Sequence, residues 1–517
     1  MSKKLTKLIL ITIFILAVGL RFIYFPDNVY FGYDQARDAY ISLGILNGDI
    51  KIKGPSASFD SNIFHGALSY YVFTPFYFIS GGDPTLASVF LRFYNAAGIF
   101  LVFLITKTIF NKRTAVFAAL IFAFSFEQTQ YALFLSHPSL AVITVLLFYY
   151  GLTRLFFKQD PKGLILAALG LGLSIQFHFS LSLLSLILIV SCIVFLIPWS
   201  ELFSRKINYQ TIIKIIPLKD IILAAICFFA AIITFIISEY KYGDFHTILT
   251  TQGKSLVNPG NAINGLLYHL QVLIRDNLFA LVDNPLPAIL ITILLFGAST
   301  FFMKHKKPLA FLSIWFIGGL IPYLMNYSKI YYYGIGGSIS LLILTAFAIN
   351  WIFQKSRIPA LVLLVIILSS NLFLILERNQ TKFNENIIVQ EGLVLPKEKQ
   401  LIDYIYQKSA GEPFSINAVM IPYNVKTTWD YLFNWYGSQK YGYLPVWGGD
   451  AAPGYEGKLK VNNVRSSLPE KRFLIIEPTK NIPSYMISGQ MKEEDYFSTI
   501  IEEKHFGNIT VQFRKAI

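Results

Sequence analysis

The sequence predicts a polytopic α-helical membrane protein that carries a small C-terminal extracytoplasmic α/β domain. Three observations lead to this fold class. First, 54% of the 517 residues are hydrophobic and only 14% are charged, whereas a soluble domain carries about 25% charged residues. Second, apolar runs of about 20 residues, the length that a spanning helix needs, recur from residue 5 to residue 376. Third, these runs stop near residue 377, and the rest of the chain mixes charges, aromatic residues and turn formers.

Eleven apolar runs are expected to span the membrane as helices. They cover residues 5–25, 85–106, 114–135, 138–156, 163–180, 181–199, 220–238, 286–303, 309–326, 334–353 and 358–376. The stretch 163–199 is one continuous apolar run, and we divide it at the polar cluster 176–180. A further run, 66–80, is short, aromatic and interrupted by Pro75, which predicts a re-entrant or interfacial segment rather than a crossing.

Lysine and arginine are concentrated in alternate loops between these runs. Those loops contain Lys3, Lys4, Lys7, Lys107, Lys112, Arg113, Arg154, Lys158, Lys162, Arg205, Lys206, Lys214, Lys219, Lys304, Lys306, Lys307, Lys355 and Arg357. Because cytoplasmic loops are enriched in basic residues, we expect a multi-pass protein of the cytoplasmic membrane with its N-terminus in the cytoplasm and the loop 26–84 outside. The net charge of +14 is spread over these loops rather than along one face, so that membrane lipids and no nucleic acid are expected as partners.

The change in composition divides the chain into two domains. Residues 1–376 form the expected transmembrane domain, and residues 377–517 form the expected extracytoplasmic α/β domain. Within the second domain, the pattern of Leu401–Tyr406 predicts a helix. Three short hydrophobic segments are typical of buried strands: 417–421, 472–476 and 509–513.

The external loop 26–84 contains two carboxylates and a guanidinium close together, Asp34, Asp38 and Arg37. If a helix begins after Gly32, the spacing of four residues places both carboxylates on one face, beside the arginine. A carboxylate held near an arginine stays ionised at neutral pH and can accept a proton from an attacking hydroxyl. The alternative is a solvated loop with an ordinary ion pair. The sequence leaves open whether Asp34 or Asp38 would be the base.

Further polar, basic and aromatic residues are expected on the same outer side of the membrane. The candidates for substrate binding are Arg37, Lys53, His65, Arg92, Gln176, His178, Lys329 and Tyr332. Cations at the depth of the lipid headgroups suit a lipid-linked phosphate, because they neutralise the charge of a leaving group. The alternatives are snorkelling to headgroups for the lysines and hydrogen bonding in a core for the histidines. The sequence has no recognisable metal motif, so that no metal ligand is assigned and a divalent cation is left open as a cofactor.

Several short motifs follow one another in an order that allows a comparison with known families. Gly32 and Asp34 lie in the first external loop, the stretch 65–71 follows in the same loop, and Leu91 and Arg92 open the second span. In this layout, residues 1–376 resemble the GT-C glycosyltransferases, close to the glycosyltransferase family 39 branch with its protein O-mannosyltransferases and aminoarabinose lipid A transferases. The segment 431–437 looks like part of a domain found in bacterial relatives.

The resemblance implies an inverting glycosyltransferase that moves a sugar from a polyprenyl-phosphate carrier to a lipid, glycan or protein acceptor on the outer face of the membrane. It implies that the loop 26–84 is catalytic and that Asp34 acts as base toward the acceptor. This chain has Asp38 four residues further on, and not the Asp-Glu pair of many relatives. The alternative function is a lipid or glycan transporter or flippase. Transporters usually have repeated halves with broken helices near the midplane, whereas the polar residues here gather at the outer boundary.

Overall fold

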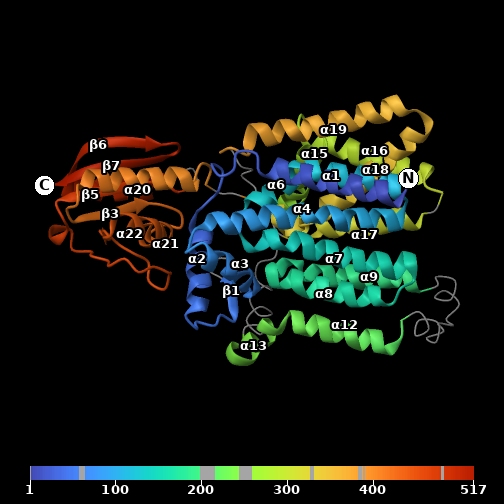
Figure 1. The fold of residues 1–517 in the computed structure, drawn as a ribbon, viewed down its shortest axis with the longest axis horizontal. Coiled ribbons are helices and arrows are strands. Elements are labelled where there is room, and N and C mark those ends of the chain that lie inside the picture. Colours follow the sequence, from blue (N-terminus) through green and yellow to red (C-terminus); the bar gives the residue numbers. More distant parts are fainter. Residues whose placement is uncertain are drawn as a thin grey trace.

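The computed structural model describes residues 2–56, 64–197, 216–243, 259–304, 306–325, 331–381, 387, 390–478 and 482–517. It confirms the predicted fold class, because a bundle of long helices is followed by a small domain built on a sheet. In Figure 1 the long helices run side by side along the long axis of the molecule. The sheet domain lies at one end of this bundle, and the N-terminus lies at the other end (Figure 1).

The described helices of the bundle account for all eleven expected spans. They are α1 (Lys3–Arg21), α4 (Pro84–Ile109), α5 (Lys112–Phe124), α6 (Phe126–Leu133), α7 (His137–Lys158), α8 (Lys162–Phe177), α9 (Leu184–Leu196), α12 (Leu218–Ala231), α13 (Ile233–Tyr242), α15 (Pro259–Asn277), α16 (Pro285–Phe302), α17 (Lys307–Met325), α18 (Gly337–Lys355) and α19 (Arg357–Arg378). The turns η1 (Phe179–Leu183) and η3 (Tyr331–Gly334) are short 3₁₀ helices before α9 and α18.

Seven of the described segments are long and apolar enough to cross a membrane: α4, α7, η1 with α9, α16, α17, α18 and α19. The helices α12 and α13 are bent by 61° relative to each other and make an eighth if they form one span. The other three expected spans are α1, which begins with Lys3, Lys4 and Lys7, and the shorter helices α5 and α8. The expected division of the run 163–199 is confirmed, because α8 ends at Phe177 and η1 begins at Phe179.

Two expectations about helices are wrong. The run 114–135 is not one helix, because Ser125 ends α5 and caps α6, where its Oγ accepts a hydrogen bond from the Gln128 amide at 3.2 Å. The stretch 239–285, which joins the expected spans 220–238 and 286–303, contains a helix that the apolar runs did not predict, α15. The sequence hides α15 because its buried residues include the polar His269 and Asn277, which interrupt the apolar pattern of a span.

The described part of the loop 26–84 folds into a unit between the bundle and the sheet domain (Figure 1). Its elements are α2 (Tyr33–Leu46), β1 (Lys53–Ser56), β2 (Phe64–Gly66) and α3 (Leu68–Ile79). The strands β1 and β2 pair antiparallel, with Lys53 opposite Gly66. The helix α3 coincides with the run 66–80, has twelve residues and packs against α2. A helix of this length is too short to cross a bilayer.

The C-terminal domain is a five-stranded mixed sheet in the order β4-β3-β5-β7-β6. Its elements are α20 (Leu395–Ser409), β3 (Phe414–Val419), α21 (Thr427–Leu432), the π-helical turn η4 (Phe433–Gly437), α22 (Ser438–Tyr441), β4 (Val446–Trp447), η5 (Arg465–Ser467), β5 (Lys471–Ile476), α23 (Ser484–Phe497), β6 (Ser498–Phe506) and β7 (Ile509–Ala516). The strand β3 is parallel to β4 and β5, and β7 is antiparallel to β5 and β6. The expected helix and three expected strands are confirmed as α20, β3, β5 and β7.

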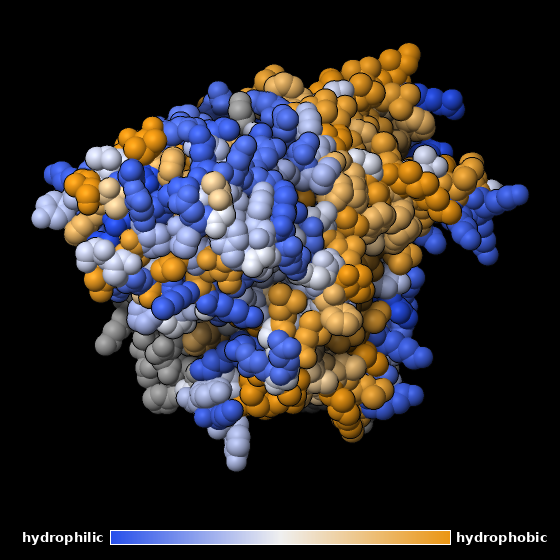
Figure 2. Space-filling view, turned by 60° about the vertical axis from the view of Figure 1, so that its left-hand side comes forward, coloured by the Kyte–Doolittle hydropathy of each residue, from blue (hydrophilic) through white to orange (hydrophobic). Residues whose placement is uncertain are grey.

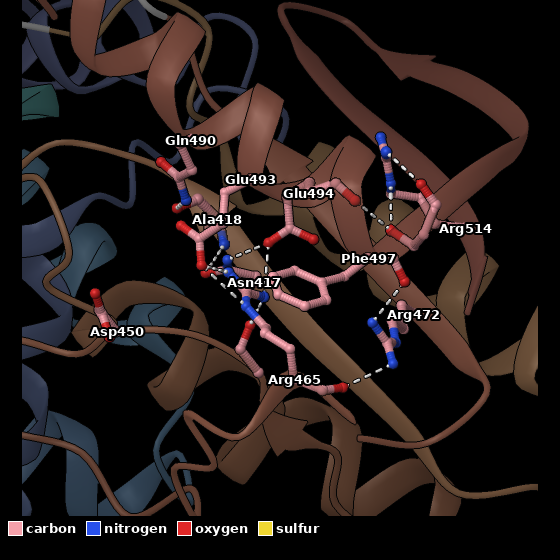
Figure 3. A network of polar contacts seen from close by, with 12 residues as sticks. Asn417, Ala418, Asp450, Arg465, Arg472, Gln490, Glu493, Glu494, Phe497 and Arg514 are labelled. Atoms are coloured by element: carbon pink, nitrogen blue, oxygen red, sulfur yellow. Dashed lines mark hydrogen bonds and ion pairs between the residues drawn. The ribbon is translucent and has the colours of Figure 1, made fainter. Parts of the chain in front are cut away.

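A buried polar network joins α23 to the sheet (Figure 3). The guanidinium of Arg465 forms ion pairs with Glu493 at 3.0 Å and Glu494 at 2.8 Å, and it donates a hydrogen bond to the Gly448 carbonyl at 2.6 Å. Glu494 also accepts a hydrogen bond from the Asn417 side chain in β3 at 2.7 Å. Because these charges are paired within the protein, the network fixes the end of β4 and the loop that follows it.

The sheet domain is docked on the loop 26–84 by backbone pairing. Tyr30 and Val394 form an antiparallel bridge, and the Leu395 amide donates to the Val29 carbonyl at 2.8 Å. From α21, the Tyr431 hydroxyl donates to the Gly82 carbonyl at 2.6 Å. The domain is therefore held directly beside α2.

The surface separates into zones along the long axis. Figure 2 shows hydrophobic residues gathered over the bundle and hydrophilic residues over the sheet domain, with more hydrophilic residues at the opposite edge. At the N-terminal end, Lys3, Lys7, Lys107 and Lys112 lie around one surface depression. An apolar zone between two polar ends is the pattern of a protein that spans a bilayer.

Candidate active site

The helix α2 places three charged side chains at the junction of the bundle and the sheet domain. Its first turn is fixed by Gln35, whose side-chain oxygen accepts from the Gly32 amide at 3.1 Å and whose amide group donates to the Leu135 carbonyl at 2.9 Å. In the helix that follows, the guanidinium of Arg37 contacts one oxygen of Asp34 at 2.7 Å and one of Asp38 at 2.7 Å. The expected helical arrangement of these residues is thus present.

The two carboxylates of this group differ in exposure. The Asp34 side chain is 46% exposed, and the Asp38 side chain is 3% exposed. Burial raises the pKa of Asp38 to about 7; Arg37 opposes this shift, and the charges of Asp34 and Glu456 add to it. The buried guanidinium of Arg37 has a pKa well above its usual range because Asp38 and Asp34 together outweigh the effect of burial. A ligand can therefore reach Asp34, whereas Asp38 acts on Arg37 from within the protein.

Three buried histidines from three different segments lie next to this group. His65 comes from β2, His137 from the first residue of α7, and His178 from the junction of α8 and η1. One nitrogen of each ring lies within 4.8 Å of one nitrogen of each of the others. Burial, with the nearby charge of Arg37, lowers the pKa of His65 to about 3, so that this ring is neutral at physiological pH.

Aromatic rings complete the wall on the side of η3. The rings of Tyr332 and Tyr333 lie 5.2 and 5.3 Å from the His178 ring, measured between centroids. Burial raises the pKa of Tyr332 well above its usual range, and the site is close enough for the charge of Asp34 to add to this shift. The structure therefore brings together six residues singled out in the sequence: Asp34, Arg37, Asp38, His65, His178 and Tyr332.

Three other candidates, Arg92, Lys53 and Gln176, contact residues other than Asp34, Arg37 and Asp38. The guanidinium of Arg92 is buried and donates to the Arg21 carbonyl at 2.5 Å and to the Asn28 side chain at 3.0 Å. These contacts join α1, α4 and the start of the first loop, so that Arg92 has a structural role. The Lys53 ammonium lies over the rings of Phe64 and Tyr242, at 4.7 and 4.2 Å.

Gln176 is directed at the protein rather than at open space. Its amide group donates to the Thr234 hydroxyl at 2.8 Å. A Cβ atom at Gly66 would come within 1.8 Å of the Gln176 side-chain oxygen, so that this contact requires glycine and sets the position of β2 next to His65. The remaining candidate, Lys329, lies outside the described residues.

Sequence reasoning did not select His137 or the loop 450–459 of the sheet domain as part of the site. His137 begins a span, and only its proximity to His65 and His178 in the fold sets it apart from other histidines. In the loop, the Tyr455 ring lies 6.1 Å from the Tyr33 ring, and Glu456 acts electrostatically on Asp38. No signal in the sequence indicates that this loop reaches α2.

The arrangement defines a class of protein: a polytopic membrane protein with an acidic site at the boundary of the bundle, beside the sheet domain. A family model described as dolichyl-phosphate-mannose-protein mannosyltransferase matches residues 65–219. This match contains all three histidines of the cluster. No curated protein matches the sequence.

Solved structures of ArnT from Cupriavidus metallidurans share the fold. The structure bound to undecaprenyl phosphate has a TM-score of 0.60 at 12% identity, and the apo structure has a TM-score of 0.60 at 13% identity. Both alignments cover 97% of this chain and 97% of the other. The apo oligosaccharyltransferase of Archaeoglobus fulgidus has a TM-score of 0.49 at 14% identity, over 80% of this chain and 62% of the other. The chain therefore shares the fold of ArnT, and its residues 65–219 are similar to the mannosyltransferase family, in agreement with the resemblance that its motifs indicated.

Proposed function

We propose that the protein is an inverting glycosyltransferase that moves a sugar from a polyprenyl-phosphate carrier to a lipid, glycan or protein acceptor on the outer face of the membrane. The observation that carries this proposal is the half-exposed carboxylate of Asp34, which Arg37 holds at the junction of bundle and sheet domain. The GT-C fold supports it, since one solved protein with this fold, ArnT, is bound to undecaprenyl phosphate, a polyprenyl phosphate.

The chemistry needs one base and a fixed geometry. Asp34 accepts the proton of the acceptor hydroxyl while the acceptor oxygen forms a bond to the anomeric carbon of the sugar. The bond between that carbon and the carrier phosphate breaks on the opposite side, and the phosphate leaves with the electron pair. A single displacement of this kind inverts the configuration at the anomeric carbon. Arg37 orients Asp34, and Asp38 in turn orients Arg37.

The same geometry separates the roles of the two carboxylates. A general base must be within hydrogen-bond reach of the proton that it accepts. Asp34 meets this requirement through its exposure, whereas Asp38 is buried and holds two nitrogens of Arg37 through one oxygen, at 2.9 and 2.7 Å. We therefore assign the base to Asp34 and a positioning role to Asp38.

The two ends of the bundle support the proposed orientation in the membrane. Lys3, Lys7, Lys107 and Lys112 lie together at the end opposite the site. Basic residues are enriched on the cytoplasmic side. This rule places the site and the sheet domain on the outer side, where a lipid-linked sugar would meet its acceptor.

The first test is sugar transfer by the purified full-length protein in detergent. Radiolabelled polyprenyl-phosphate sugars serve as donors and a membrane extract supplies the acceptor. We expect label to move to an extract component, and we expect Asp34→Asn to slow this transfer by about 10²–10⁴-fold, the range for loss of a general base. Asp49→Asn is the matched control, because Asp49 is an exposed acid just beyond α2 that pairs with Lys51.

Two results would contradict the proposal. Sugar transfer by Asp34→Asn at the full rate would show that Asp34 is not the base. Binding of the donors without transfer, across the common sugars, would instead favour a lipid or glycan transporter, in which Asp34 has no chemical role.

A further inference from the structure

We propose that His65, His137 and His178 form a binding site for one transition-metal ion, for which Zn²⁺ is the best match. The existence of this site rests on the histidines alone, and only its role rests on the function proposed above. Imidazole nitrogen is a preferred ligand of Zn²⁺, and three protein ligands with one open position are the arrangement of catalytic zinc sites. The three rings are buried, at 6, 8 and 2% exposure respectively.

The three histidines come from segments far apart in the sequence, and the hydrogen bond from the Phe179 amide to His65 helps to hold β2 beside His178. His65 lies in β2, and its ring lies 4.6 Å from the His137 ring and 4.5 Å from the His178 ring, measured between centroids. Polar imidazoles are costly to bury unless their nitrogens are satisfied. A shared ligand would satisfy all three at once.

The nitrogen positions are close to those that a metal requires. The nitrogens lie within 4.8 Å of one another. Around a tetrahedral Zn²⁺ with bonds of 2.0–2.1 Å, the nitrogens would be separated by about 3.3 Å. The site therefore has to contract by at most about 1.5 Å, which side-chain rotation can supply.

The surroundings of two of the rings are those of metal ligands. The Nδ1 atom of His178 lies 2.6 Å from the Ser180 hydroxyl oxygen, and Nδ1 of His137 lies 3.3 Å from the Ser136 hydroxyl oxygen. In the tautomers that donate to these serines, both Nε2 atoms have a free electron pair. A hydrogen bond to the other ring nitrogen is the usual way in which a ligand histidine is oriented.

His65 is the ligand that must rearrange. Its Nδ1 accepts a hydrogen bond from the Phe179 amide at 3.0 Å, which leaves the proton on Nε2. A neutral His65 therefore binds the metal through Nδ1 in place of this bond. The exchange gives up one hydrogen bond and gains one metal–nitrogen bond.

The local charge also suits a divalent cation. The charge of Arg37 acts on His65, and it is offset by Asp34 and Asp38, so that these three side chains together carry one negative charge when both acids are ionised. The histidines themselves add no charge. An ion with an open position would attract an oxygen ligand, and a phosphate oxygen of the proposed donor is the chemical class that fits.

Metal content of the full-length protein tests this inference. The protein is purified with an affinity tag that contains no histidine, stripped with EDTA, reconstituted with Zn²⁺ or Co²⁺ and freed of excess metal. We expect about one ion per chain, with the visible absorption of tetrahedral Co²⁺. His137→Gln and His178→Gln should each weaken binding at least 10-fold. His505→Gln, which changes an exposed histidine, should bind as the unchanged chain does.

A conservative variant guards against misfolding of the histidine variants. Ser180→Ala keeps all three ligands and removes only the partner of His178, so that it should fold and weaken binding by about 10-fold, the effect of losing an outer hydrogen bond. The inference is overturned if the unchanged chain retains less than 0.1 ion, or if the double variant His137→Gln/His178→Gln retains a full ion. Either result would mean that the rings form a neutral wall for a ligand.

The outcome is separable from that of the proposed function. Sugar transfer that continues in the metal-free chain, together with failure to bind metal, removes the site and leaves the transferase standing. Binding of one ion without any transfer removes the transferase and leaves the metal site standing.

Discussion

At the scale of single residues, the contrast between Asp34 and Asp38 decides how the site works. Both contact Arg37, but only Asp34 is open to a ligand. Because burial raises the pKa of Asp38 to about 7, this group is protonated in an increasing fraction of molecules as the pH falls below neutral. Arg37 then loses one of its two anionic partners and is held less firmly.

We therefore predict that activity falls as the pH is lowered through 7, and that Asp38→Asn removes this dependence. Asparagine resembles the protonated form of Asp38 at every pH, so that kcat should be about 10-fold lower at pH 8 while KM changes little. Initial rates from pH 5.5 to 8.5 give the profile. If Asp38→Asn keeps the same acid limb as the unchanged chain, Asp38 does not control the site.

The sequence could predict this part of the site because its contacts are local. Arg37 is three residues from Asp34 and one residue from Asp38, so that helix geometry alone brings the three side chains together. The role of Arg92 could not be predicted in this way, because its partners Arg21 and Asn28 lie 71 and 64 residues away. A guanidinium near the outer end of a span has the same sequence signature whether it binds a phosphate or a carbonyl.

At the scale of secondary-structure elements, the link between α2 and α21 connects the proposed catalytic helix to the sheet domain. The Tyr40 hydroxyl donates to Asp430 at 2.5 Å, and its ring contacts the Tyr431 ring edge-on at 4.9 Å. Asp430 is buried and also accepts from the backbone amides of Lys458 and Leu459. One carboxylate thus holds both α2 and the loop that carries Tyr455.

Tyr40→Phe tests this link with little disturbance, since it removes one hydroxyl and keeps the ring. Asp430 retains its other donors, so that the loss should be about 1–3 kcal/mol of stability, the range for a hydrogen bond to a charged group. Thermal unfolding in detergent measures this change. Tyr24→Phe is the matched control, because the Tyr24 hydroxyl donates to the Leu376 carbonyl in an exposed position and its loss should have a smaller effect. An equal loss of stability in Tyr40→Phe and Tyr24→Phe would show that the hydrogen bond to Asp430 contributes no more than an exposed hydrogen bond.

Among the elements, the sequence predicted those with a single clear pattern. The long apolar runs became helices, and the hydrophobic segments of β3, β5 and β7 became strands. It did not predict α15 or the break at Ser125, because buried polar residues there bond to distant elements. Asn277 of α15, for example, donates to Glu127 of α6 at 2.6 Å. The pattern of apolar residues along the sequence does not show which buried polar residues form such pairs.

At the scale of the whole molecule, the position of the sheet domain over the first loop is the feature that could least be predicted from the sequence. The hydrogen bond from Tyr40 to Asp430 joins residues 390 positions apart. Composition could show that a second domain follows the bundle, but not which loop it contacts. Two acids of the sheet domain, Glu398 and Glu477, are buried near this contact, close enough for their charges to act on Tyr30.

These acids make the stability of the molecule depend on pH. Burial raises the pKa of Glu477 to about 7, and burial together with the charge of Glu477 raises the pKa of Glu398 well above its usual range. Both groups therefore bind a proton more tightly in the folded state than in the unfolded state. Their favourable contribution is complete at low pH and is lost as the pH rises from about 4.5 through 7, by roughly 3 kcal/mol for Glu477.

We accordingly predict that the protein unfolds at a higher temperature at pH 6 than at pH 8, and that Glu398→Gln reduces this difference. Both carboxyl oxygens of Glu398 are buried without a hydrogen-bond partner among the described residues, so that glutamine removes the titrating group and breaks none of the described hydrogen bonds. Thermal unfolding of the full-length protein in detergent at both pH values measures the effect, with Glu412→Gln as a control at an exposed acid. A Glu398→Gln variant whose pH difference equals that of the unchanged chain would mean that Glu398 does not titrate in this pH range, and that Glu477 alone makes the stability depend on pH.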